Sequence, residues 1–147
     1  MSGVGFRATK GDISTGTAAK TIGQVVAAAN HAANLSEISV SFKGGSSDVP
    51  VLVEVLRQTT AGTMSSLTPV KSPDDSDETL QVTAQHTATA EPTAGDILDT
   101  QYVPAQSGYT WVVDDADEFK IGGGDRIGIR VTSAVDFKCA WSVKGKE

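Results

Sequence analysis

Hydrophobic and polar residues alternate with a period of two over much of this chain, and this alternation predicts β-strands. In the stretch "ISVSF", Ile38, Val40 and Phe42 fall on one side while two serines fall on the other. The same alternation recurs at residues 80–90, 109–113, 126–131 and 137–143. Each of these segments would place its apolar side chains on one face of a sheet, so we expect half-buried strands.

Two segments depart from this simple pattern. Residues 51–56, "VLVEVL", are apolar on both faces, and this predicts a strand in the interior of a sheet. Residues 17–33 are rich in alanine, which favours helix by propensity, but β-branched residues such as Ile22 and Val25 favour strand. We expect two strands here with a break near residues 30–34, and a short helix is the alternative.

Loops and turns separate the expected strands. "GGSSD" at 44–48 is a loop, "GGGD" at 122–125 is a tight turn, and 61–78 is a long polar connection with two prolines and four acids. Seven to nine strands without a long helix predict an all-β protein, an antiparallel β-sandwich of the jelly-roll type. We expect residues 20–147 to form this single domain and residues 1–19 to form an extended N-terminal arm, flexible or docking.

Charge is unevenly distributed along the 147 residues, whose net charge is −6. Residues 1–43 carry +2, residues 44–118 carry −11 and residues 119–147 carry +3. The acidic middle would repel phosphate backbones, so we expect no nucleic-acid partner. The basic ends fit either solvated faces or contact with an acidic partner.

Membrane spans, secretory signals and disulfide frameworks are not expected. The chain has no run of about 18 apolar residues, and its start lacks the apolar segment of a secretory signal. Its single cysteine, Cys139, excludes an intrachain disulfide and fits assembly in a reducing cytosol. Cys139 alternates in line with Phe137 and Trp141, so we expect a buried small hydrophobe and not a nucleophile.

The stretch "AQHTATAEPTAGDILDT", residues 84–100, is the strongest candidate for chemistry. It brings together four polar residues: His86, Glu91, Asp96 and Asp99. A metal-binding jelly roll needs two histidines one residue apart, then a glutamate and a distant histidine, whereas this chain has only His31 besides His86. We therefore predict no metal site and a partly buried structural histidine at 86.

Two acidic clusters could supply oxygen ligands to a cation. They lie at 74–78, "DDSDE", and at 114–118, "DDADE", and neither has the spacing of an EF-hand loop. We expect solvated loops, and calcium binding is the alternative. With no convergent acid, base and nucleophile in the sequence, we expect no enzyme, no cofactor and no catalytic residue.

Four segments in order carry a family resemblance. They are "KTIGQVVAAANHAANLSEISVSFKG", "PVLVEVLRQTTAGTMSSLTPVK", "TAQHTATAEPTAGDIL" and "GGGDRIGIRVT", and together they span roughly residues 20–135. This set resembles the small jelly-roll decoration, or cement, proteins of tailed-bacteriophage capsids. The resemblance implies a non-enzymatic virion protein, assembled in the host cytoplasm, that sits on the outer capsid as a homotrimer and reinforces contacts between major capsid subunits.

Such a protein works through a surface, so the resemblance transfers no individual functional residue. From the residues themselves we expect Phe6 and Arg7 to anchor the arm on a partner, because an aromatic ring and a planar cation make strong interface contacts. Two alternatives remain open: a head-fibre or tail component of the same fold, or a carbohydrate-binding β-sandwich using Tyr109, Trp111 and the acidic loops.

Overall fold

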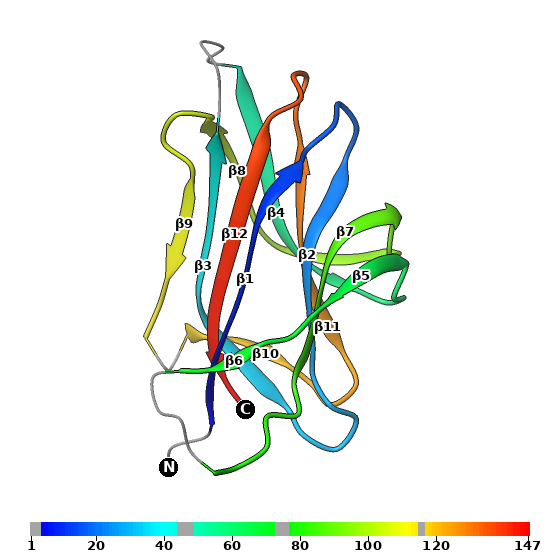
Figure 1. Ribbon diagram of the computed structural model, residues 1–147, viewed down its shortest axis with the longest axis vertical. Helices are drawn as coiled ribbons and strands as arrows, with labels where there is room; N and C mark the ends of the chain where they lie inside the picture. The colour runs from blue at the N-terminus through cyan, green and yellow to red at the C-terminus, as the bar shows by residue number, and fades with distance from the viewer. Residues whose placement is uncertain (1–3, 44–48, 73–76, 115–116) are drawn as a thin grey trace.

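The computed structural model describes residues 4–43, 49–72, 77–114 and 117–147. These residues form two antiparallel sheets of six strands each. Figure 1 shows the two sheets packed face to face. The described residues contain no α-helix. The expected all-β sandwich is therefore confirmed.

Sheet A contains the strands from the two ends of the chain. Its main strand order is β10-β3-β12-β1-β6, and β9 also pairs with β3. The bounds are β1 (Gly5–Ser14), β3 (Ala33–Lys43), β6 (Val70–Lys71), β9 (Tyr109–Val112), β10 (Phe119–Ile121) and β12 (Lys138–Lys146). Strand β12 pairs with β1 on one side and with β3 on the other, so it lies inside the sheet.

Sheet B has the order β5-β7-β2-β11-β4-β8. Its bounds are β2 (Lys20–Val26), β4 (Pro50–Gln58), β5 (Thr63–Leu67), β7 (Thr83–Ala90), β8 (Ala94–Pro104) and β11 (Arg126–Thr132). The chain alternates between sheets from β1 to β4 and again from β8 to β12, apart from the short β10. Hydrogen bonding within each sheet therefore joins strands that are distant in sequence.

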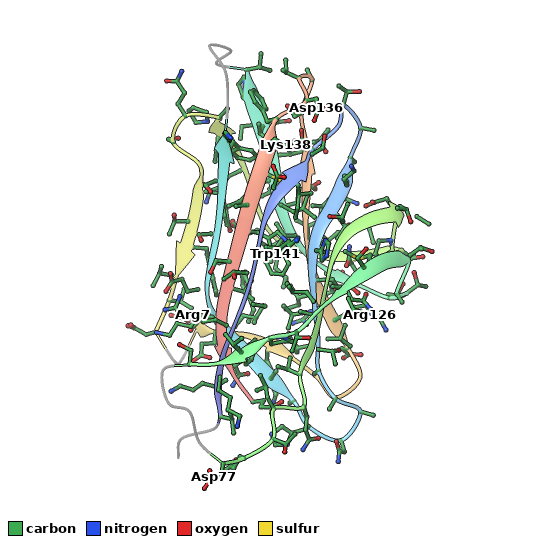
Figure 2. All side chains as sticks on the ribbon, in the orientation of Figure 1. Arg7, Asp77, Arg126, Asp136, Lys138 and Trp141 are labelled. Atoms are coloured by element: carbon green, nitrogen blue, oxygen red, sulfur yellow. The ribbon has the colours of Figure 1, made fainter. Side chains whose placement is uncertain are left out.

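The core between the sheets consists of the inward members of each alternating strand. Its largest fully buried side chains are Trp141, Tyr109 and Phe6. Trp141, labelled in Figure 2, lies against the backbone of Gly23 on the opposite sheet, where an added Cβ would stand 2.7 Å from the indole Cδ2. The absence of a side chain at Gly23 is what admits the indole.

Several local expectations are confirmed. The alanine-rich segment forms β2 and β3, separated by a turn with an isolated Ala28–His31 bridge. Strand β4 has neighbours on both sides, as its two apolar faces predicted. At "GGGD", the Asp125 N–H donates to the Gly122 carbonyl at 2.9 Å, and Gly124 has φ +80°, so this segment is a tight turn.

The prediction of an N-terminal arm is wrong for residues 5–14, because these residues form β1, which lies between β12 and β6 in sheet A. Phe6 is completely buried, and Ala8 and Ile13 also point into the core. A β-bulge between Lys10 and Ile13 breaks the period-two pattern, which is why the sequence did not predict a strand. The sandwich therefore begins before residue 20.

The long connection expected at 61–78 is also corrected, because it contains β5 and β6. Both strands lie at sheet edges, and Met64 and Leu67 are the only apolar residues of β5. An edge strand needs a partner on one side and little burial, so its composition can be that of a loop.

Candidate functional site

The polar stretch at 84–100 is structural in three of its four candidate positions. His86 is half-buried on β7, and its Nδ1 lies 2.9 Å from the Thr87 hydroxyl. Desolvation, with a smaller contribution from the charge of Lys10, holds the pKa of His86 below its usual value. The imidazole is therefore favoured in its neutral form, as expected of a structural histidine.

Glu91 fastens the end of β7 to β2. Its carboxylate accepts the backbone N–H of Thr21 at 2.9 Å and the Thr21 hydroxyl at 2.8 Å. Thr21 is completely buried, and its hydroxyl also accepts a hydrogen bond from Gln58, whose own carbonyl oxygen accepts one from Gln24. Residues 91–93 thus bond to β2 through Glu91 and to the end of β4 through Thr93, whose carbonyl accepts the N–H of Thr59.

Asp99 joins the two sheets, while Asp96 is exposed on β8. The hydroxyl of buried Tyr109, on β9, donates a short hydrogen bond to the Asp99 carboxylate. Burial first, and then the bond to Asp99, raises the pKa of Tyr109. Tyr109 therefore links the two sheets through its hydrogen bond to Asp99. Its ring is buried and is not available to a sugar, contrary to the carbohydrate-binding alternative.

The candidates for metal chemistry do not converge within the described residues. No group of three or more His, Cys, Asp or Glu side chains lies close enough there to hold an ion. Residues 74–76 and 115–116 of the acidic clusters lie outside the described residues. Calcium binding by the complete clusters therefore stays an alternative.

Cys139 is buried in the core beside Phe137 and Trp141, as the alternation predicted. Burial raises the pKa of its thiol from 9.0 to about 12. Because the thiolate is the nucleophile, this environment makes Cys139 poorly reactive at neutral pH.

The buried thiol predicts a specific alkaline loss of stability. A raised folded-state pKa leaves stability unaffected below the unfolded pKa, and stability then falls as the pH rises toward the folded value. Between pH 9 and 12 we expect Cys139 to contribute a slope of up to about 1.4 kcal/mol per pH unit. Urea unfolding of Cys139→Ala should show a shallower decline from pH 9 to 10, before Tyr109 begins to contribute. Equal slopes in the two proteins would contradict this account.

The outer face of sheet A has a different character from these buried bonds. The strands of sheet A carry eight basic and two acidic side chains, whereas those of sheet B carry four and three. On the three long strands the outward basic residues are Arg7, Lys43, Lys138, Lys144 and Lys146. We call these five residues and the side chains between them the basic face.

Like charges stand opposite each other on the basic face. Arg7 is the register partner of Lys144, and Lys43 is the register partner of Lys138. On its other side, Lys144 has Glu37 of β3 as its register partner. Directly opposed like charges destabilise a sheet. Within the described part of the chain, none of the five basic residues forms an ion pair with a carboxylate. By contrast, Arg130 and Glu54 of sheet B do form an ion pair. Two opposed like-charge pairs in one sheet surface depart from the arrangement that favours stability, and such a departure marks a candidate for function.

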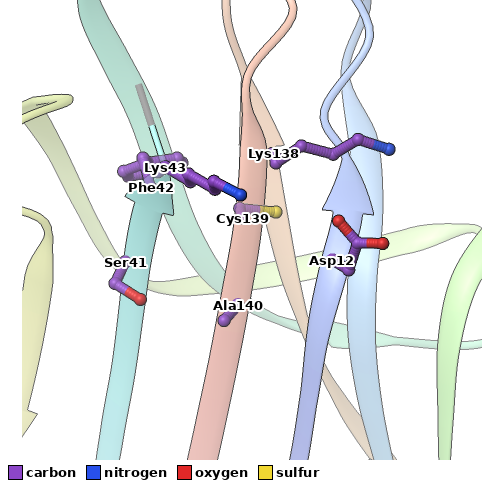
Figure 3. A pocket seen from close by; sticks show the side chains of 7 residues that line it. All are labelled: Asp12, Ser41, Phe42, Lys43, Lys138, Cys139 and Ala140. Carbon is purple, nitrogen blue, oxygen red and sulfur yellow. The ribbon is translucent and has the colours of Figure 1, made fainter. Parts of the chain in front are cut away.

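Between the charged ends, the basic face carries small side chains. Ser39 lies opposite Ser142, which lies opposite Thr9, and Ser41 lies opposite Ala140. Three shallow hollows follow this surface, of about 330, 470 and 550 Å³. Figure 3 shows the first, with Lys43 and Lys138 around it, and Ser41 and Ala140 line both this hollow and the next.

The sequence prediction found only part of this surface. Arg7, expected to be an anchor, lies on the basic face, but Phe6 next to it points into the core and is not exposed to a partner. The alternation of "FKCAWSVK" did place Lys138 and Lys144 outward, and both ends of the chain were basic. What the sequence did not indicate is that β1, β3 and β12 are neighbours, so that these separate charges share one face.

Comparisons of the chain with protein-family models, curated proteins and solved structures found no match. Among the described residues no helix has the length and apolar character needed to span a bilayer.

Proposed function

We propose that this protein is a non-enzymatic capsid decoration protein, which binds the outer surface of an assembled phage head and reinforces contacts between major capsid subunits. The observation that carries the proposal is the basic face, a broad outer sheet surface with five basic side chains that lack ion-pair partners in the described chain. A surface of this extent is suited to contact another protein surface and not to enclose a small substrate.

The bonding of the other polar groups supports a structural role. Several carboxylates act as fasteners: Glu91 holds β2, Asp99 holds Tyr109, and the Glu147 side chain accepts the N–H groups of Gln81 and Val82 at 2.7 and 2.8 Å. The Glu91 and Glu147 bonds join segments that are distant in sequence, and the Asp99 bond joins the two sheets. A sandwich tied in this way presents a rigid surface, which lowers the entropy lost on binding.

We further propose that the sandwich is a jelly roll. Its support is the order of eight strands: β1-β12-β3-β9 in sheet A and β2-β11-β4-β8 in sheet B. In each sheet, strands from the two halves of the chain are interleaved, as in the double Greek key of jelly-roll virion proteins. The additional strands β5, β6, β7 and β10 extend this framework.

Binding to a lattice also accounts for how such a small protein would act. A ligand that binds only the assembled state stabilises that state by mass action. A homotrimer, as the resemblance implies, would add avidity, because the second and third contacts become intramolecular. Weak charge contacts at one basic face would therefore suffice when several copies bind together.

The direct test is co-sedimentation of the full chain with intact particles of the tailed phage that encodes it. We expect saturable binding to assembled heads and little binding to dissociated capsid subunits at the same subunit concentration. Density for the sandwich on the outer surface in cryo-electron microscopy would locate the contact. Equal binding to dissociated subunits, or density confined to the tail, would refute a decoration role.

A further inference from the structure

The three hollows of the basic face follow one another along β12, and we call them together the trough. The first hollow lies between Lys43 and Lys138. The second lies over Ser39, Ser41 and Ser142, and the third is lined by Lys144 and Lys146. Strand β12 has 9 residues, so the trough is about 30 Å long at ~3.3 Å per residue. Small side chains along its middle allow another backbone to approach closely.

The charges of the trough are unequal along its length. The Lys43–Lys138 end is bordered by one carboxylate, Asp12. At the other end, Lys144 of β12 stands between Arg7 of β1 and Glu37 of β3. The third hollow is lined by Lys144, Lys146 and three carboxylates: Glu37, Asp114 and Glu118. The central hollow is lined by hydroxyl groups and by one cation, Lys10. The trough therefore favours anionic groups at its two cation pairs, with hydroxyl groups and Lys10 between them.

We infer that the trough binds an extended acidic segment of a partner protein, lying along β12 with carboxylates at the Lys43–Lys138 and Arg7–Lys144 pairs. This inference rests on the proposed function, in which that partner is the capsid subunit, and the charge complementarity of the trough selects the acidic chemistry. A carboxylate placed between two opposed cations accepts hydrogen bonds from both and removes their mutual repulsion. The serines and Thr9 supply hydrogen bonds to the segment between these points.

The like-charge pairs make a stability test possible alongside the binding test. Arg7→Glu and Lys43→Glu each replace a repulsive cross-strand pair by an attractive one, because the partners Lys144 and Lys138 remain. We expect each variant to keep or raise its Tm while it binds more weakly. A residue with a purely structural role would not lose binding as its fold becomes more stable.

Two binding assays separate this inference from the proposed function. The first assay measures binding to intact particles. The second measures, by fluorescence anisotropy, binding to a labelled peptide of alternating glutamate and serine that has the same length as β12, 9 residues. In both we expect Arg7→Glu/Lys43→Glu to bind roughly tenfold or more weakly than the native chain, and added salt to weaken native binding. The matched control is Arg126→Glu, which reverses a basic residue on sheet B (Figure 2) and should bind like the native chain.

Each outcome decides one of the two claims. Native binding to the peptide but not to particles would refute the decoration role and leave the acidic-segment inference supported. Particle binding that the double reversal does not weaken would overturn the inference and leave the decoration role supported. A glutamine–serine peptide that binds equally well, a single-stranded oligonucleotide that binds more tightly, or an oligomer that dissociates on reversal would each overturn it in favour of a different occupant.

Discussion

Gly23→Ala is expected to destabilise the sandwich by about 3 kcal/mol, or roughly 10 °C in Tm for a chain of this size. The new Cβ would stand 2.7 Å from both Cδ2 and Cζ2 of Trp141, and the indole is a rigid ring enclosed in the core. Relief requires the two sheets to separate or the indole to leave its rotamer. Urea unfolding monitored by tryptophan fluorescence would measure the loss.

Gly11→Ala is the matched control for this prediction. Gly11 also lies in a strand, but its added Cβ would meet only the Ala140 Cβ, at the ordinary contact distance of 3.8 Å. Replacing glycine by alanine lowers the conformational entropy of the unfolded chain. Where the native site accepts alanine, this stabilises a protein by about 0.4–1 kcal/mol. The same chemical change should therefore have opposite signs at the two positions.

A double-mutant cycle with Trp141→Phe tests the cause of the Gly23 effect. The smaller phenylalanine ring lacks the indole atoms that lie nearest the new Cβ. The buried Nε1–H of Trp141 has no hydrogen-bond partner among the described residues, so its removal leaves no acceptor unpaired. We expect the double variant to be more stable than the sum of the two single losses predicts. Strict additivity would show that Gly23 is needed for another reason.

The period-two pattern predicted most of the sandwich because burial and alternation coincide in its regular strands. In β12, every second residue from Cys139 to Val143 is buried, and the pattern is visible in the sequence. It failed where a bulge shifts the register, as in β1, or where an edge strand buries little, as in β5. Alternation reports burial on one face and does not report which strands become neighbours.

That limit explains why the candidate site was only partly predicted. The sequence contained the cations of β1, β3 and β12, but the basic face exists only because the ends of the chain pair in one sheet. Conversely, the stretch from His86 to Asp99 looked chemical because fasteners and catalytic groups use the same residue types. The burial of β1 also means that deleting residues 1–19 would remove an interior strand and would not test docking.

Glu91→Ala is expected to cost about 2–3 kcal/mol of stability, although the glutamate itself is exposed. Its carboxylate is the acceptor for both the backbone N–H and the hydroxyl of buried Thr21. Without it, a buried N–H loses its partner, and such a donor costs its full desolvation energy. Urea unfolding would measure the loss, and Asp96→Ala, which removes an exposed carboxylate a few residues away on β8, should have an effect near zero.

The Glu91 effect should extend beyond Thr21, because a carboxylate can only accept hydrogen bonds. Its charge directs the Thr21 hydroxyl outward, which leaves that oxygen to accept from Gln58 at 3.0 Å, and Gln58 in turn accepts from Gln24 at 2.7 Å. Glu91→Gln keeps an acceptor but adds a donor that opposes this direction, so we expect an intermediate loss of about 1 kcal/mol. If Glu91→Ala were as stable as Asp96→Ala, the buried amides would be ordered by their packing alone and the fastening role of Glu91 would be refuted.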